Sequence, residues 1–134
     1  VDYGHNAMAV SGLMELVLGI DAARRLGVIT APGDRRDDDI RELGRLAAEL
    51  DHVIIKEDSD RRGRDPGEIA GLVREGLVAG GLSDDEIEVV ADELEAVDRG
   101  IALLNDRDLL VVLVDDVPGV LEHLRGRSQP AAVS

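Results

Sequence analysis

Cysteine is absent from this chain of 134 residues, and aromatic residues make up 1% of it. Without cysteine there is neither a disulfide framework nor a thiolate metal site. Because Tyr3 is the single aromatic residue, the core has to be built from leucine, valine, isoleucine and alanine. The hydrophobic fraction of 44% is sufficient for such a core, and the length is that of one domain.

Basic residues are also scarce. Fifteen lysines and arginines stand against 29 aspartates and glutamates, so the net charge is -14, and Lys56 is the only lysine. Nucleic acids and anionic membranes are recognised by basic surfaces, so the balance argues against both as partners. An acidic surface favours solubility and attracts cationic ligands.

Long apolar runs and phosphate-binding loops are missing too. No run approaches the roughly 18 apolar residues of a membrane span, and no signal peptide is visible. The default expectation is a cytoplasmic globular domain. The sequence contains neither GxxxxGK[ST] nor GxGxxG. The domain therefore lacks the usual means of holding a triphosphate by itself.

What is present is a regular alternation of apolar runs and amphipathic stretches. Strands are predicted at residues 1–3, 26–31, 52–57, 86–90 and 108–114, and helices at 40–50, 68–79, 92–105 and 116–126, with a further helix that Asn6 can cap near the start of the chain. Continuous apolar strands alternating with helices indicate an α/β domain, in which a mainly parallel sheet of five or six strands is covered on both faces. The central strands should bury Ile29, Val53, Ile54, Ile55, Val111, Val112 and Leu113. The first helix should present Met8, Leu13, Leu16 and Val17 on one face. We expect the domain to span residues 1–126, with 127–134 as a flexible tail.

Ligands of parallel sheets bind outside the carboxyl ends of the strands, and the charged segments of this chain fall there. The first is VDYGHN, at residues 1–6. Asp2 is placed to accept hydrogen bonds from a ribose, and His5 and Asn6 lie at a helix start, which favours an anion. The alternative is a capped helix start with an exposed histidine. Because a strand opens the chain, we expect that more of the parent protein precedes Val1.

The second segment is PGDRRDDD, at residues 32–39. Gly33 and Asp34 suit a sharp turn. Arg35 and Arg36 can bind a carboxylate or phosphate. Alternatively, these arginines pair with the acids at 37–39, which also suit the first turn of the next helix.

The third segment is KEDSDRRGR, at residues 56–64, which overlaps DSDRRGRDPG (58–67), the most polar stretch of the chain. Acidic and basic groups stand side by side there, which suits a zwitterionic ligand such as an amino acid. The candidate binding residues are Lys56, Asp58, Asp60, Arg61 and Arg64. We expect this loop to be exposed and to share one sheet edge with Asp2 and Asp34. The alternative is a loop whose charges satisfy one another. The spacing misses the calcium-loop pattern, so no metal site is assigned.

Together the segments VDYGHN, PGDRRDDDI and VIIKEDSDRRGRDPGEIAGL resemble the carboxyl-terminal domain of the Mur ligase family, in particular its cyanophycin synthetase branch. The resemblance extends from Val1 to about Leu124. Ala7 departs from the family, which usually has proline after HN. The segment VDDVPGV stands where the peptidoglycan ligases have a GKGHE-type sequence, and this second departure also favours the cyanophycin branch.

The resemblance implies a Rossmann-like lid of an ATP-dependent amide ligase. Such ligases activate a carboxylate as an acyl phosphate, which an amine then attacks. The triphosphate loop and the Mg²⁺ ligands belong to a central domain outside this chain. In the cyanophycin branch, arginine is added to a poly-aspartate backbone. By motif, Asp2 would contact the ATP ribose, and His5 and Asn6 would lie near the reacting phosphates. Arg35, Arg36 and the loop at 56–64 would line the substrate side.

Two other classes stay open at this point. One is a non-catalytic binding or assembly module that keeps the fold. The other is a receiver-like phosphorylation domain, which requires an acid pair after the first strand and a lysine after the last. Here Asp2 stands alone, and the segment VLVDD ends in acids without a lysine.

Overall fold

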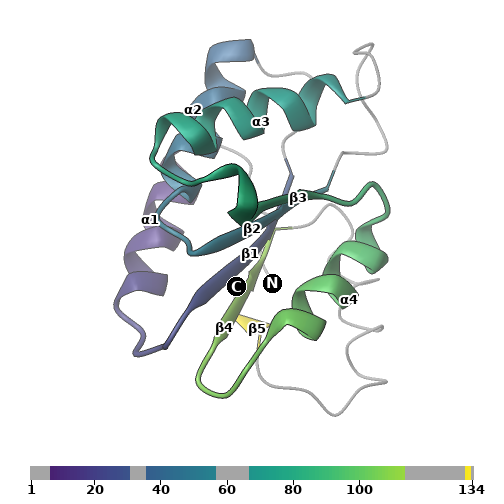
Figure 1. The fold of residues 1–134 in the computed structure, drawn as a ribbon. Coiled ribbons are helices and arrows are strands. Elements are labelled where there is room, and N and C mark those ends of the chain that lie inside the picture. Colours follow the sequence, from purple (N-terminus) through teal and green to yellow (C-terminus); the bar gives the residue numbers. More distant parts are fainter. Residues whose placement is uncertain (1–6, 31–35, 57–66, 114–131, 134) are drawn as a thin grey trace.

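The computed structural model describes residues 7–30, 36–56, 67–113 and 132–133. Five strands form one sheet, shown in Figure 1. They are β1 (Arg25–Ile29), β2 (His52–Ile55), β3 (Ile87–Val89), β4 (Leu109–Val112) and β5 (Ala132–Val133). Their order is β3-β2-β1-β4-β5, and every neighbouring pair is parallel. The predicted α/β class with a parallel sheet is confirmed, with five strands.

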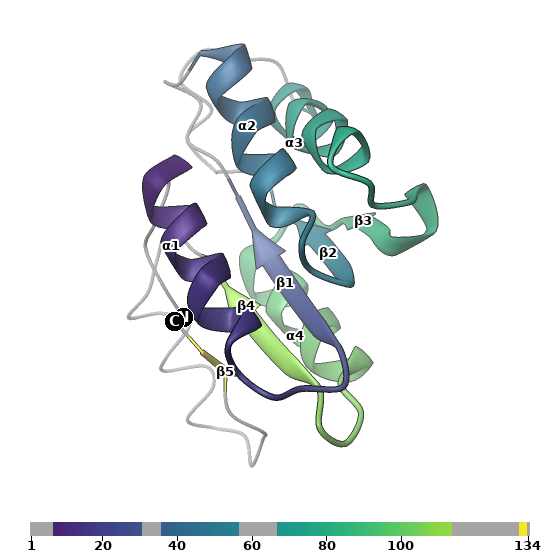
Figure 2. The same ribbon diagram turned by 90° about the vertical axis from the view of Figure 1, so that its left-hand side faces the viewer.

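Helices cover both faces of the sheet, as Figures 1 and 2 show. On one face lie α1 (Ala7–Leu18), α2 (Asp37–Ala47) and α3 (Glu68–Ala79), and on the other lies α4 (Glu93–Leu103). A short 3-10 turn, η1 (Asp84–Glu86), precedes β3. Each face has its own apolar core, so the sheet is the middle of three layers. Parallel strands buried on both faces read as unbroken apolar runs, and for this reason the sequence revealed them.

The residues predicted to be buried on the central strands are buried. Val111 is 0% exposed and Leu113 is 3% exposed, and none of the seven exceeds 4%. The prediction for Leu16 is wrong, because this side chain is 53% exposed. Helix α1 instead packs through Val10, Leu13, Met14 and Val17, which follow the helical repeat and lie on one face.

Two glycines allow α2 and α3 to approach each other closely. A Cβ on Gly76 would overlap the backbone carbonyl oxygen of Arg41, and one on Gly44 would overlap that of Val73. The two helices therefore meet backbone to backbone. By contrast, a Cβ on Gly71, on the exposed side of α3, would meet nothing within 4 Å.

Two predicted elements lie wholly outside the described residues. These are the strand at 1–3 and the helix at 116–126. Within the predicted tail at 127–134, Ala132 and Val133 form β5, which pairs with Leu110 and Val111 of β4. The predicted helix at 68–79 has the bounds of α3. The other strands are shorter than predicted by one to three residues.

Candidate functional site

The parallel topology brings the carboxyl ends of β1 to β4 to one edge of the sheet, which we call the carboxyl edge. The first residues beyond these strands are Thr30, Lys56, Val90 and Leu113. Backbone hydrogen bonds continue the ladder through them: Lys56 N donates to Ile29 O over 2.8 Å, and Val90 N donates to Ile55 O over 2.9 Å. Thr30 and Lys56 are therefore neighbours on adjacent strands, one residue beyond the paired Ile29 and Ile55.

Thr30 and Lys56 are buried polar residues, with 4% and 5% of their surfaces exposed. Side chains alternate between the faces of a strand, so both follow Val28 and Ile54 on the face that α4 covers. Burial of Lys56 contradicts our expectation that the whole loop at 56–64 is exposed. The parallel sheet encloses this first residue between its neighbours on β1 and β3. The Thr30 hydroxyl oxygen is buried, and it has no hydrogen-bond partner within the part of the chain that the structure describes.

Arg36, the other predicted binding residue in the described part, lies at the start of α2. Its guanidinium donates to both carboxylate oxygens of Asp39, over 3.1 and 3.3 Å, and its side chain is 85% exposed. These hydrogen bonds raise the pKa of Arg36. The structure thus favours, for Arg36, the alternative in which the arginine pairs with the following acids. An exposed ion pair of this kind contributes little to the free energy of folding. A ligand anion can therefore replace Asp39 as the partner of Arg36 at small cost.

The remaining predicted site residues lie outside the described residues. They are Asp2, His5, Asn6, Arg35, Asp58, Asp60, Arg61 and Arg64. In the sequence they precede α1, precede α2 or follow β2, so their roles stay predictions. Within the described part of the chain, no three histidines or carboxylates are grouped as a metal site would require. None of the helices described there has the length and apolarity that a bilayer crossing requires.

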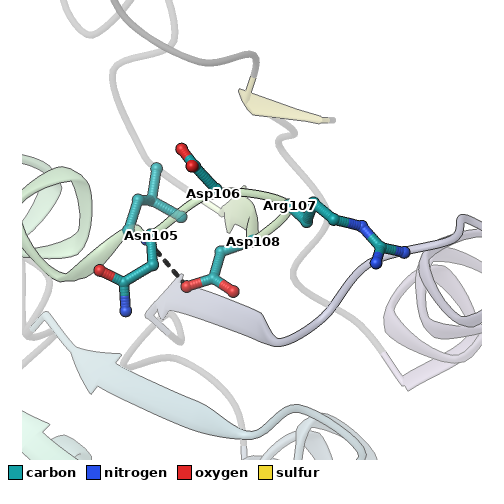
Figure 3. A pocket seen from close by; sticks show the side chains of 5 residues that line it. Asn105, Asp106, Arg107 and Asp108 are labelled. Atoms are coloured by element: carbon teal, nitrogen blue, oxygen red, sulfur yellow. Dashed lines mark hydrogen bonds between the residues drawn. The ribbon is translucent and has the colours of Figure 1, made fainter.

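A hollow of about 610 Å³ lies at the opposite edge, before β4, and is lined by residues 104–108 (Figure 3). Two of the side chains that line it, Arg107 and Asp108, are already paired. The Asp108 carboxylate accepts hydrogen bonds from Asn105 N over 2.9 Å and from the Arg24 guanidinium over 2.6 Å. The Arg24 hydrogen bond outweighs burial and holds the pKa of Asp108 below its usual value. We call the ion pair of Arg24 and Asp108 the clasp, because it joins the start of β1 to the turn before β4. We interpret it as structural, since ligands of parallel sheets bind at the other edge.

A second cluster, missed by the sequence analysis, joins β2, β3 and α4. His52 Nε2 lies 2.6 Å from Glu88 Oε2, and Arg99 Nε donates to Glu88 Oε1 over 2.8 Å. In the sequence, His52 stands out only as the first residue of the strand predicted at 52–57. No local motif signals the cluster, because its members come together only when the strands are paired in register.

A parallel sheet between two helical layers, with the buried polar residues Thr30 and Lys56 at its carboxyl edge, defines a three-layer α/β domain. The family model described as "Mur ligase, glutamate ligase domain" matches residues 1–113. The chain therefore belongs to the Mur ligase family, as the resemblance of its motifs predicted.

Individual relatives are similar along nearly the whole chain. The cyanophycin synthetase of Geminocystis herdmanii is 40% identical over 128 residues, which cover 92% of this chain. The UDP-N-acetylmuramoyl-L-alanyl-D-glutamate–2,6-diaminopimelate ligase of a Chelativorans species is 29% identical over 84% of this chain. The chain spans 14% of the length of the first protein and 22% of the second. A solved structure of a ligase with the latter name superimposes with a TM-score of 0.74 at 18% identity, covering 93% of this chain and 28% of that one, and so supports the fold.

Proposed function

We propose that this chain is the carboxyl-terminal lid domain of an ATP-dependent amide ligase of the cyanophycin synthetase kind. The observation that carries the proposal is the 40% identity to a cyanophycin synthetase over 92% of the chain. The parallel topology supports it independently, since segments 31–35 and 57–66 follow β1 and β2 and begin at the carboxyl edge.

The proposed reaction has two steps. A side-chain carboxylate of the acceptor attacks the γ-phosphorus of ATP, forming an acyl phosphate and releasing ADP. The amine of the incoming amino acid then attacks the acyl carbon, an amide bond forms, the amine loses a proton, and phosphate leaves. In our proposal the amino acid is arginine and the acceptor is a poly-aspartate backbone. Mg²⁺ and the triphosphate would be held mainly by a central domain outside this chain, which has no GxxxxGK[ST] loop.

The residues of this chain would orient the substrates and exclude water. Asp2 would accept hydrogen bonds from the ribose, and His5 and Asn6 would lie near the reacting phosphates. Arg35 and Arg36 would face a carboxylate, and the acids of the loop at 56–64 would face the arginine guanidinium. Closure of such a lid matters because an acyl phosphate exposed to water hydrolyses before the amine attacks.

The test uses the complete ligase that contains this domain. Purified enzyme is given ATP, Mg²⁺, an aspartate polymer and arginine, and ADP release and the mass of the polymer are followed. We expect continued ADP release, beyond one equivalent per enzyme, to require both the polymer and an amino acid, and the polymer mass to rise by one arginine residue per bond formed. Lysine and glutamate in place of arginine test the substrate. A complete protein that releases no ADP under any of these conditions would be a binding or assembly module instead.

A further inference from the structure

The buried hydroxyl of Thr30 is the polar group of the described chain whose position the fold does not explain. Thr30 is 4% exposed, and its Oγ1 has no hydrogen-bond partner among the described residues. Burying a hydroxyl without a partner is unfavourable, so proteins usually pair such groups. Valine has nearly the same shape and would fill the same position without that cost. An unpaired hydroxyl at the ligand-binding edge of a parallel sheet therefore points to a partner that arrives with a ligand.

The surroundings of Thr30 indicate what kind of ligand group it meets. The neighbour across the β1–β2 ladder is Lys56, which is itself 5% exposed and lies on the same face of the sheet. On the other side of Lys56, Val90 is the next residue across the sheet, and it packs against the apolar core beneath α4. Lys56 already has an interaction partner, but an ammonium group has three donors, so a buried lysine on the strand next to Thr30 disfavours a cation and favours an anionic oxygen.

We propose that Thr30 and Lys56 form an oxyanion subsite at the carboxyl edge, in which the Thr30 hydroxyl donates a hydrogen bond to a carboxylate or phosphate oxygen of a substrate. Thr30 thereby becomes a binding residue that no motif of the sequence identifies. The assignment of the subsite to the ligation reaction rests on the function proposed above. The presence of an anion site does not depend on the proposed function, and anion binding is measured separately.

The first experiment measures anion binding by the 134-residue chain. Thermal unfolding is followed in sodium phosphate, in sodium acetate and in sodium chloride at equal ionic strength. The variants are Thr30→Val, which removes the hydroxyl, and Thr30→Ser, which keeps it. For the wild type and Thr30→Ser we expect phosphate or acetate to raise the Tm by about 2 °C or more over chloride. Thr30→Val should gain nothing from either anion, although its Tm in chloride should equal or exceed that of the wild type. Equal gains in all three proteins, or no gain in the wild type, overturn the proposal.

The second experiment assigns the source of the anion in the complete ligase. If the oxygen belongs to the amino acid, Thr30→Val should raise the KM for that substrate about tenfold or more and leave the KM for ATP unchanged. If the oxygen belongs to a phosphate group, Thr30→Val should raise the KM for ATP and leave the KM for the amino acid unchanged. Thr30→Ser should restore most of the lost affinity in either case, and Lys56→Met should weaken the same substrate as Thr30→Val. A Thr30→Val enzyme with unaltered KM values refutes the subsite. A wild-type enzyme without ligase activity refutes the proposed function, while the unfolding measurement still decides the anion site.

Discussion

The His52 imidazole lies 2.6 Å from the Glu88 carboxylate and thereby ties the edge strand β3 to β2. Arg99 of α4 donates to the other oxygen of the same carboxylate over 2.8 Å. The three side chains are 17%, 28% and 48% exposed, so water reaches the cluster from one side. Because the strand β3 has only three residues, these side-chain bonds supplement a short ladder of backbone bonds.

Glu88 is predicted to give the domain a pH-dependent part of its stability. Burial raises the pKa of its carboxyl, but the hydrogen bonds from Arg99 and His52 outweigh that effect and hold the pKa below the ordinary value of 4.5. A lowered pKa means that the stabilisation is complete above the unfolded-state value and is lost as the pH falls through the folded-state value. Glu88→Gln should therefore cost about 1 kcal/mol of unfolding free energy at pH 7, and the difference should shrink as the pH falls below 4.5 and disappear below the folded-state pKa.

The measurement is urea unfolding at a series of pH values between 3 and 8. Glu49→Gln is the matched control, because Glu49 is an exposed carboxylate on the opposite side of the sheet. It should leave the pH profile unchanged. A Glu88→Gln deficit that stays constant at all pH values would mean that packing, and not ionisation, explains the loss.

Gly76 is predicted to be irreplaceable for the packing of α3 on α2. A Cβ at this position would overlap the backbone of Arg41, which cannot move aside as a flexible side chain can. Gly76→Ala should destabilise the domain by about 3 kcal/mol, at the upper end of the usual cost of overpacking. Gly71→Ala, on the open side of the same helix, should stabilise it by up to about 1 kcal/mol through helix propensity. Equal effects of the two substitutions on the urea midpoint would contradict the close approach of the helices.

The fold could be predicted because its strands are buried on both faces and therefore appear as unbroken apolar runs. The helix faces were less certain: Leu16 fits a helical spacing, but the packed stripe of α1 runs through Val10 and Met14 instead. Spacing within one helix does not reveal which of two adjoining stripes faces the sheet. Only the neighbouring layers decide it.

The candidate site could be predicted only as far as the chain's local patterns extend. The sequence identified the segments that start at the carboxyl edge, because topology places the ends of parallel strands together. It did not identify Thr30, since a threonine at a strand end is unremarkable until its neighbours leave the hydroxyl unpaired. It did not join His52 to Glu88 either, because these residues are 36 positions apart and meet only through the β2–β3 register.

The clasp between Arg24 and Asp108 is predicted to be structural. The Asp108 side chain is 2% exposed and accepts two hydrogen bonds from Arg24, at 3.1 and 2.6 Å. Asp108→Ala leaves the half-exposed guanidinium without this partner and should cost about 2 kcal/mol. Asp106→Ala, in the same turn but exposed, should change the unfolding free energy by less than about 0.5 kcal/mol. If the complete ligase carrying Asp108→Ala is stable yet loses substrate affinity, the hollow beside this turn has a binding role that we have not assigned.

The isolated chain is predicted to bind Mg-ATP poorly. It lacks a GxxxxGK[ST] loop, and the proposed function leaves it only the ribose-side contacts. Isothermal titration calorimetry on the 134 residues should show no binding tighter than about 1 mM. The complete ligase, titrated under the same conditions, is the positive control. A Kd in the low micromolar range for the isolated chain would place the nucleotide site in this domain. It would contradict our proposal that a central domain outside this chain holds the triphosphate.

The last prediction separates the two substrates by the residues that serve them. In the complete ligase, Arg61→Ala or Arg64→Ala should raise the KM for the amino acid or the polymer and leave the KM for ATP nearly unchanged. Asp2→Ala should do the opposite, since its proposed partner is the ribose. Losing one charge-assisted hydrogen bond costs roughly 1.5–3 kcal/mol, which corresponds to about a tenfold to hundredfold change.

Steady-state kinetics with each substrate varied in turn decide between these outcomes. Arg74→Ala is a suitable control, because Arg74 lies on α3 and pairs with Asp84, away from the carboxyl edge. The two sets of variants serve as controls for each other, because a general loss of folding would lower the apparent kcat in every variant and leave both KM values unchanged. If the arginine variants alter only the KM for ATP, or alter nothing, residues 57–64 would be a solvated surface whose charges satisfy one another.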